Sequence, residues 1–126
     1  MDIVFLIGRI VFGLIFVFFG VNHFMKKDQM VAYAASQGVG GASFFVPATG
    51  LILLLGGLSV ATGVFPQVGL ILLILFLVPT SFIMHRFWGV SPEEKMQQMP
   101  HFMKNMALAA AALALLFISL PWPLSL

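Results

Sequence analysis

The chain alternates between long apolar runs and short polar connections. A helix of about 20 residues crosses a hydrocarbon core about 30 Å thick, and each apolar run is close to that length. Because lipid offers the backbone no hydrogen-bond partners, such runs must be helical, and the lack of strict alternation argues against a barrel. The pattern therefore predicts four spanning helices, over residues 3–21, 43–65, 68–84 and 102–120.

The connections between these runs differ in length and polarity. Residues 65–67 are so few that the second and third spans must form an antiparallel hairpin. Residues 25–37 place apolar side chains at helical spacing opposite polar ones, which predicts a short helix in the membrane interface. The stretch Ser91-Pro92-Glu93-Glu94 has the form of a capping box and predicts a second short helix running toward Pro100. We therefore predict an all-α integral membrane four-helix bundle, a single transmembrane domain over residues 1–126, with two short amphipathic interfacial helices.

Composition supports this fold class and excludes several functions. With 61% hydrophobic and 8% charged residues, the chain has too few polar side chains to form the surface of a soluble domain, which needs about a quarter charged residues. It contains no cysteine, which excludes disulfides and thiolate chemistry. The net charge of +2 is too small for a nucleic-acid-binding surface, so membrane lipids are expected partners and nucleic acid is not.

The basic residues are distributed unevenly along the chain. Five of the six Lys and Arg residues belong to the first and third connections, namely Lys26, Lys27, Arg86, Lys95 and Lys104. Because cytoplasmic connections carry an excess of Lys and Arg, both termini are predicted to lie outside. We expect Lys26, Lys27, Arg86 and Lys104 to contact lipid head groups or a partner protein.

Polar residues within the spans are informative because hydrocarbon makes them costly. Arg9, Gly13, Phe16, Gly20 and His23 share one stripe of the first helix, and we expect this face to look into the bundle. Two interpretations of Arg9 are open: its side chain extends to the outer head groups, or it contacts a buried anion or ligand. No carboxylate lies at a similar depth, so a counter-charge would have to come from a ligand, a lipid or another subunit.

The third span contains a proline, Pro79, that removes one backbone donor. We expect it to kink the helix and to widen the charged end of the bundle. Thr80 and Ser81 follow directly and are available to bond the carbonyls that the proline leaves free.

Three histidines, His23, His85 and His101, are predicted to lie at the charged end, each at the end of a different helix. A metal or haem would need such a ligand set. However, no ligand-like pair spaced four residues apart occurs, and histidines are common at head-group boundaries. We therefore favour an interfacial role and expect no metal. The methionines near this end are interpreted as deformable apolar cover rather than as a copper site.

Four stretches of the chain, taken in order, resemble the DoxX family of small four-helix integral membrane proteins. They are GRIVFGLIFVFFGVNHF (8–24), LILLLGGLSVATGVFP (51–66), MHRFW (84–88) and HFMKNMALAAAALAL (101–115). The resemblance implies a bacterial or archaeal inner-membrane protein. Some such relatives are the membrane subunit of a thiosulfate:quinone oxidoreductase or partners of redox and detoxification proteins. The family motif positions that carry over are Arg9, His23, His85, Phe87, Trp88, Lys104 and Asn105.

The chain departs from many relatives at two places. Ile52 and Leu53 stand in the second span where relatives carry an acidic residue, and Arg86 stands where relatives often have an acidic or small one. Both departures argue against carboxylate-assisted proton transfer.

These observations lead to one favoured function and to an alternative. No nucleophile or oriented base is recognisable, so we expect an accessory or membrane-anchoring subunit of a redox or detoxification system, without catalytic activity alone. It would bind a quinone or lipid-like molecule, with His85 and Asn105 bonding a carbonyl head group. The alternative is a homo-oligomeric small-molecule permease or ligand-binding membrane protein, and a freestanding oxidoreductase ranks third. The ligand-binding candidates are Arg9, His23, His85, Trp88 and Asn105.

Overall fold

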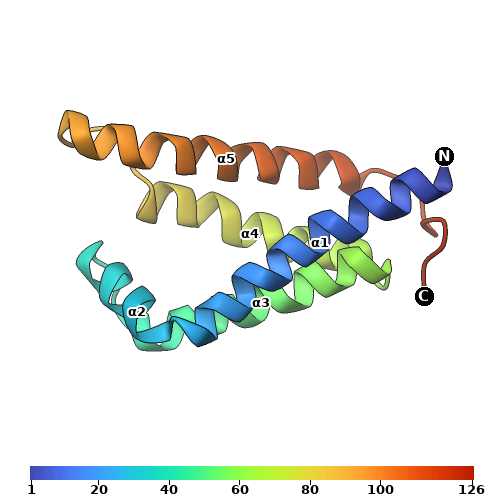
Figure 1. Cartoon of the computed structure of the whole chain (residues 1–126), viewed down its shortest axis with the longest axis horizontal. Helices are drawn as coiled ribbons and strands as arrows, with labels where there is room; N and C mark the ends of the chain where they lie inside the picture. The colour runs from blue at the N-terminus through green and yellow to red at the C-terminus, as the bar shows by residue number, and fades with distance from the viewer.

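The computed structural model describes residues 1–126 and consists of five α-helices and their connections. They are α1 (Asp2–Met25), α2 (Lys27–Ser36), α3 (Ala42–Thr62), α4 (Pro66–Met84) and α5 (Pro92–Leu116). All but α2 are long and apolar enough to cross a membrane, so the predicted all-α membrane fold is confirmed. Figure 1 shows α2 and the α4–α5 connection at one end of the molecule, which we call the basic end. Both termini and the α3–α4 turn lie at the other, which we call the terminal end.

The two predicted interfacial helices differ in outcome. The first is present as α2, whereas the expectation of a separate second helix ending near Pro100 is wrong. The start is as predicted, because the Ser91 hydroxyl accepts a hydrogen bond from the Glu94 N–H at 3.2 Å. From there α5 continues through Pro100 to Leu116. A proline removes one intrahelical hydrogen bond, and a helix already more than two turns long can continue past that loss.

Two spans end earlier than predicted, and both ends lie close together. The backbone of Gly63 adopts a left-handed conformation with φ of 78°, which glycine favours at helix ends, and α3 therefore stops at Thr62. α5 stops at Leu116, and residues 117–126, which we call the C-terminal segment, fold back toward α3. The Leu126 N–H donates to the Thr62 carbonyl at 3.1 Å, which satisfies one of the acceptors that the end of α3 leaves free.

The closest helix pair is α1 and α3, and glycines make the approach possible. Gly13 lies against Gly57, and Gly20 lies against Gly50, so that an added Cβ at any of them would collide with the facing helix. Small residues drive such contacts in membranes, where the hydrophobic effect cannot bring helices together. The predicted inward stripe of α1 is confirmed, since its buried residues are Arg9, Gly13, Phe16 and Gly20.

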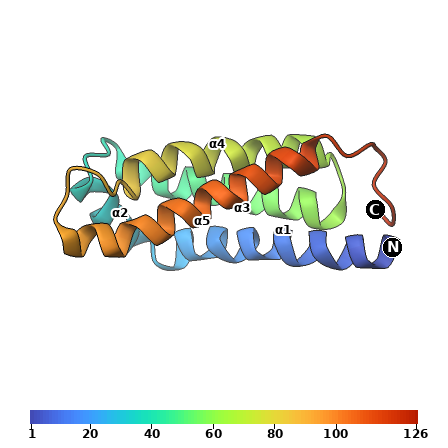
Figure 2. The same cartoon turned by 90° about the horizontal axis from the view of Figure 1, so that it is seen from above.

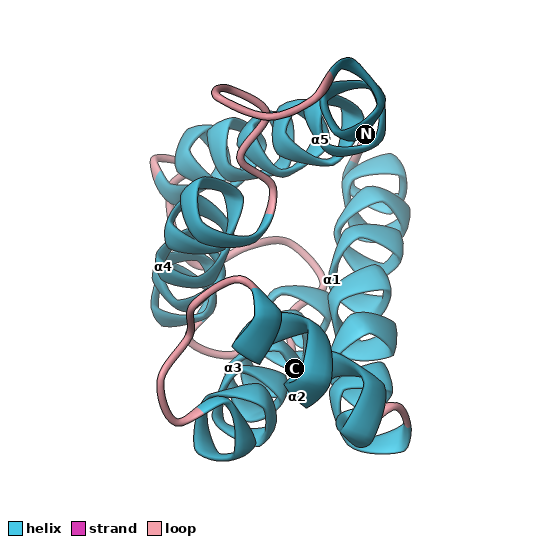
Figure 3. Ribbon diagram, turned by 90° about the vertical axis from the view of Figure 1, so that its left-hand side faces the viewer, coloured by secondary structure: helices cyan, strands magenta, loops and turns pink.

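The packed core lies away from the basic end. It is formed by Phe16, Leu53, Val60, Leu70, Leu73, Leu77, Ala109, Ala112 and Trp122. Figures 2 and 3 show that α5 runs obliquely over the bundle, with α1 and α4 on opposite sides of it. α5 packs on α4 and α1 packs on α3, whereas the backbones of α1 and α5 lie farther apart and meet through side chains such as Phe19 and Lys104. Within α4, the buried Ser81 hydroxyl donates to the Leu77 carbonyl at 2.8 Å, two residues either side of Pro79.

Candidate ligand-binding site

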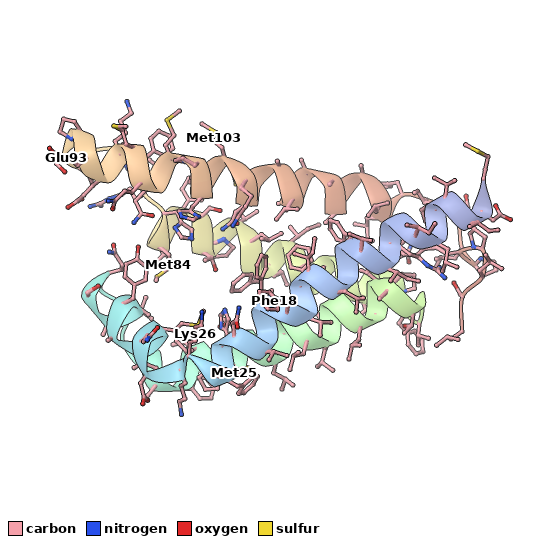
Figure 4. The ribbon with its side chains drawn as sticks, viewed as in Figure 1. Phe18, Met25, Lys26, Met84, Glu93 and Met103 are labelled. Atoms are coloured by element: carbon pink, nitrogen blue, oxygen red, sulfur yellow. The ribbon has the colours of Figure 1, made fainter.

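A cavity of about 730 Å³ lies between the helices toward the basic end. All five helices contribute to its wall, and 14 of its 22 lining residues are hydrophobic. Its size and lining suit a drug-sized apolar molecule. α2 covers part of it by packing Ala34 against Ala42 and Val46 of α3. Figure 4 shows Met84, at the end of α4, on the side that faces α2 across this region.

His23, near the end of α1, is held against α3 at one side of the cavity. Its Nδ1 lies 3.0 Å from the Val46 carbonyl oxygen and 3.2 Å from the Thr49 hydroxyl. The Thr49 hydroxyl in turn donates to the Phe45 carbonyl at 2.7 Å. The edge of the imidazole meets the ring of Phe76 from α4, with centroids 5.8 Å apart. The ring is therefore fixed in orientation by two neighbouring helices.

His85 belongs to a chain of hydrogen bonds that joins three elements at the cavity mouth. The Tyr33 hydroxyl of α2 donates to the Met84 carbonyl at 3.1 Å, and Gln98 Nε2 of α5 donates to that hydroxyl at 2.8 Å. His85 Nδ1 lies 2.9 Å from Gln98 Oε1, and His101 stacks on His85 with centroids 5.1 Å apart. A vestibule of about 520 Å³ beside these groups shares Tyr33 and His85 with the cavity.

The protonation of His85 follows from its surroundings just beyond the spanning part of α4. Burial lowers the pKa of the His85 imidazole, and the nearby charges of His101 and Lys104 lower it further. The hydrogen bond to Gln98 acts in the opposite direction. The ring is accordingly neutral at pH 7 and has a nitrogen able to accept a hydrogen bond.

Asn105 of α5 supplies the most buried polar group of the cavity wall. Only 7% of Asn105 is exposed, and no hydrogen bond within the chain reaches its amide, although the fully enclosed side-chain nitrogens without a partner are Arg9 Nε and Trp122 Nε1 at the other end. Buried amides normally have partners, because an unpaired one is costly. Lys104, its exposed neighbour at the rim, holds its Nζ 5.5 Å from the centroid of the Phe19 ring. The polar part of the cavity thus combines His23, His85 and Asn105.

Comparison with known proteins assigns the chain to a family. The model of the DoxX family matches residues 4–86, from the start of α1 to the connection after α4. The chain belongs to the DoxX family. It is 31% identical over 121 residues to Inner membrane protein YphA of Escherichia coli (strain K12), covering 96% of this chain and 86% of that relative. No solved structure matches the chain. The relationship to an inner membrane protein and the four apolar spans together make the DoxX chain a multi-pass membrane protein.

Trp88 of this DoxX protein lies outside the cavity, although it was a candidate for ligand binding. It is 44% exposed and belongs to an aromatic cluster at the α4–α5 connection. Its edge-to-face partners are Phe82, Phe87 and Phe102, with centroids 5.4 to 5.8 Å away. Aromatic residues in such places are typical of the boundary between lipid and water.

Arg9 is even farther from the other candidates, because it lies at the terminal end. It is 2% exposed and enclosed by the C-terminal segment. Its Nη1 donates to the Ser125 hydroxyl at 2.9 Å, and its Nη2 donates to the Leu124 carbonyl at 2.7 Å. The guanidinium carbon lies 5.9 Å from the ring centroids of both Phe5 and Trp122.

The cation of Arg9 has no carboxylate partner, yet the chain itself supplies compensating negative potential. Nη1 packs against Gly63, the residue that caps the C-terminus of α3. A helix C-terminus carries roughly half a negative charge, and aromatic faces add to the attraction. From the sequence, the compensating negative charge for Arg9 was expected from a ligand, a lipid or a second subunit. In the structure, α3 and the C-terminal segment supply the negative potential. The side chain is turned inward rather than toward head groups.

Sequence reasoning missed Tyr33 and Gln98, which complete the polar mouth of the cavity. Tyr33 is the only tyrosine of the chain, and its place in an amphipathic segment was the one available signal. The three histidines do not share one ligand set, because His23 bonds α3 while His85 and His101 stack on each other. No group of three metal-binding side chains lies close enough to hold an ion.

Proposed function

We propose that this DoxX family protein holds a hydrophobic small molecule, quinone-like or lipid-like, as an accessory or anchoring subunit of a redox or detoxification system in a prokaryotic inner membrane. One observation carries the proposal. Asn105 as a residue is more than nine-tenths buried, no hydrogen bond within the chain reaches its amide, and it lines a cavity with largely apolar walls. A ligand with a polar head and an apolar tail would satisfy both parts of that surface.

The division of the cavity supports an amphipathic occupant. The head group would lie near His23, His85 and Asn105, which are polar residues of the cavity lining. The tail would lie among aliphatic and aromatic side chains such as Leu53 and Phe76.

The basic end supports a second part of the proposal, docking to lipid head groups or to a partner protein. Lys26, Lys27 and Arg86 are exposed there and form no ion pair within the chain. Exposed basic residues beside spanning helices attract anionic lipid and acidic protein surfaces. The cavity mouth opens among these same elements, so a docked partner would lie next to the bound molecule.

The proposal is tested by extracting the protein gently and identifying what accompanies it. Native mass spectrometry of the full chain in mild detergent should show a bound amphiphile. In the variant Asn105→Leu, the fraction of protein that carries it should fall at least about ninefold. Ala110→Leu is the matched control, since Ala110 is exposed on the same helix. Wild-type protein that carries no small molecule, or an Asn105→Leu variant as fully occupied as the control, would contradict the proposal.

A further inference from the structure

The hydrogen bonds at the cavity mouth fix which nitrogen of His85 carries the proton. The Met84 carbonyl can only accept, so the single hydroxyl proton of Tyr33 points to it. Gln98 must then donate to the Tyr33 oxygen through its amide nitrogen, which turns its amide oxygen toward His85. An amide oxygen can only accept, and Nδ1 of His85 therefore carries the proton. The other nitrogen, Nε2, is left as an acceptor.

His23 reaches the same state by an independent route. Its Nδ1 faces the Val46 carbonyl at 3.0 Å, which again can only accept. The nearby Thr49 hydroxyl has the Phe45 carbonyl at 2.7 Å and the Val46 carbonyl at 3.0 Å as acceptors, both nearer than the imidazole at 3.2 Å, so its single proton goes to a carbonyl. Nδ1 of His23 therefore donates, and its Nε2 is the free acceptor.

Two acceptors without donors thus belong to one cavity. No protein group hydrogen-bonds Nε2 of either histidine, and both rings line the cavity. No Asp or Glu lines it, and the one cation on its wall, Lys104, is exposed at the rim. Asn105 and Asn22 each add one acceptor and two donors, and Lys104 adds donors at the rim. The two histidine Nε2 atoms are therefore acceptors that a donor on the occupant can satisfy.

We infer that the occupant presents hydroxyl donors: it is a neutral amphiphile with a hydroxyl-bearing head, of the alkylphenol type. The inference rests on the proposed function and narrows its ligand class. A head that only accepts, such as a ketone or an ether, leaves both Nε2 atoms unpaired, which is costly inside an apolar site. For an occupant with a redox-active ring, the same rule favours the dihydroxy form over the dicarbonyl form. This differs from the carbonyl head group expected from sequence.

The test uses three probes that share one tail and differ in their heads. They are 4-octylphenol, which donates; 4-octylanisole, which only accepts; and 4-octylbenzoate, which is anionic. Calorimetric titration into the full chain in lipid nanodiscs, with empty nanodiscs subtracted for partitioning, gives the three affinities. One neutral hydrogen bond is worth roughly a fivefold to tenfold change in affinity, so the phenol should bind about that much more tightly than the anisole.

Variants show whether the histidines cause the preference. In the double variant His23→Leu/His85→Leu, the ratio of phenol to anisole affinity should fall toward one, because both acceptors are lost and the single hydroxyl of the phenol has neither to bind. The ratio is taken within each variant, so a general loosening of the fold affects both probes alike. Ala110→Leu is the matched control, since Ala110 is exposed on α5 and does not line the cavity, and it should keep the wild-type ratio.

The outcomes separate this inference from the function on which it rests. Equal binding of phenol and anisole would overturn the inference and leave the proposed function standing. Tightest binding of the benzoate would also overturn it, and would assign recognition to the cation of Lys104. If none of the three probes binds above the empty nanodisc, the proposed function fails and the inference fails with it.

Discussion

At the terminal end, a buried cation is fully enclosed by its own chain, whereas at the basic end a buried amide and two imidazole nitrogens face a cavity without protein partners. Arg9 receives a carbonyl, a hydroxyl and the end of α3, while Asn105 receives nothing. Both residues are polar groups within apolar runs, and the sequence treats them alike. The difference teaches that a polar residue within a span points to a ligand only where its polar atoms face a cavity, because Arg9 Nε also lacks a partner but is enclosed by the chain itself.

The first prediction concerns which end of the molecule faces the cytoplasm, and its test gives an all-or-none result. The distribution of Lys and Arg predicts that the basic end is cytoplasmic and the termini are outside. Because the chain has no cysteine, single cysteines at Gln67 and Ser36, both exposed, report opposite ends. A membrane-impermeant maleimide should label Gln67→Cys from outside only and Ser36→Cys only after lysis. The reverse pattern would refute the orientation.

Removing the enclosed cation should cost the most stability. Arg9→Met keeps the apolar stem but strands the Ser125 hydroxyl and the Leu124 carbonyl, and it should lower the free energy of unfolding by about 2 kcal/mol. Unfolding by SDS in mixed micelles measures this change. Ligand occupancy of the folded fraction should stay as in wild type, because the cavity lies at the other end. A variant that is stable but empty would abolish the contrast between the two ends.

The opposite result is expected for the unsatisfied amide. Asn105→Leu removes a buried polar group that has no partner, so the unfolding free energy should be unchanged or rise by up to about 1 kcal/mol, even as ligand is lost. The same SDS titration, carried out on delipidated protein, measures it. A loss of stability as large as that of Arg9→Met would mean that Asn105 is structural.

The smallest effect concerns pH at the cavity mouth. Because the pKa of His85 is lowered in the fold, the unfolded chain binds the proton more readily below pH 6.5, the ordinary value. Stability from this residue is therefore complete above pH 6.5 and decreases as pH falls below it. The thermal midpoint should drop slightly between pH 7.5 and 5.5 in wild type, and less in His85→Phe. An equal drop in both proteins would assign the effect to other groups.

The elements that follow periodicity were predictable, and those that depend on distant contacts were not. The inward stripe of α1 could be read from spacing and from the cost of polar groups in hydrocarbon, and Asn105 became a candidate through the resemblance to the family. The bond between Gln98 and Tyr33 joins residues 65 positions apart and depends on how α2 lies against α5. The enclosure of Arg9 joins residues 115 positions apart, through a segment whose prolines give no helical pattern. No local signal specifies such contacts.

The docking of the last residues has a practical consequence for handling the protein. The Leu126 N–H bonds the end of α3, and Ser125 and Leu124 accept hydrogen bonds from Arg9. A fusion at the carboxyl end would therefore pull on the only hydrogen-bond partners of that cation. Met1 is 99% exposed. An affinity tag or fluorescent reporter therefore belongs at the amino end, where it leaves this closure intact.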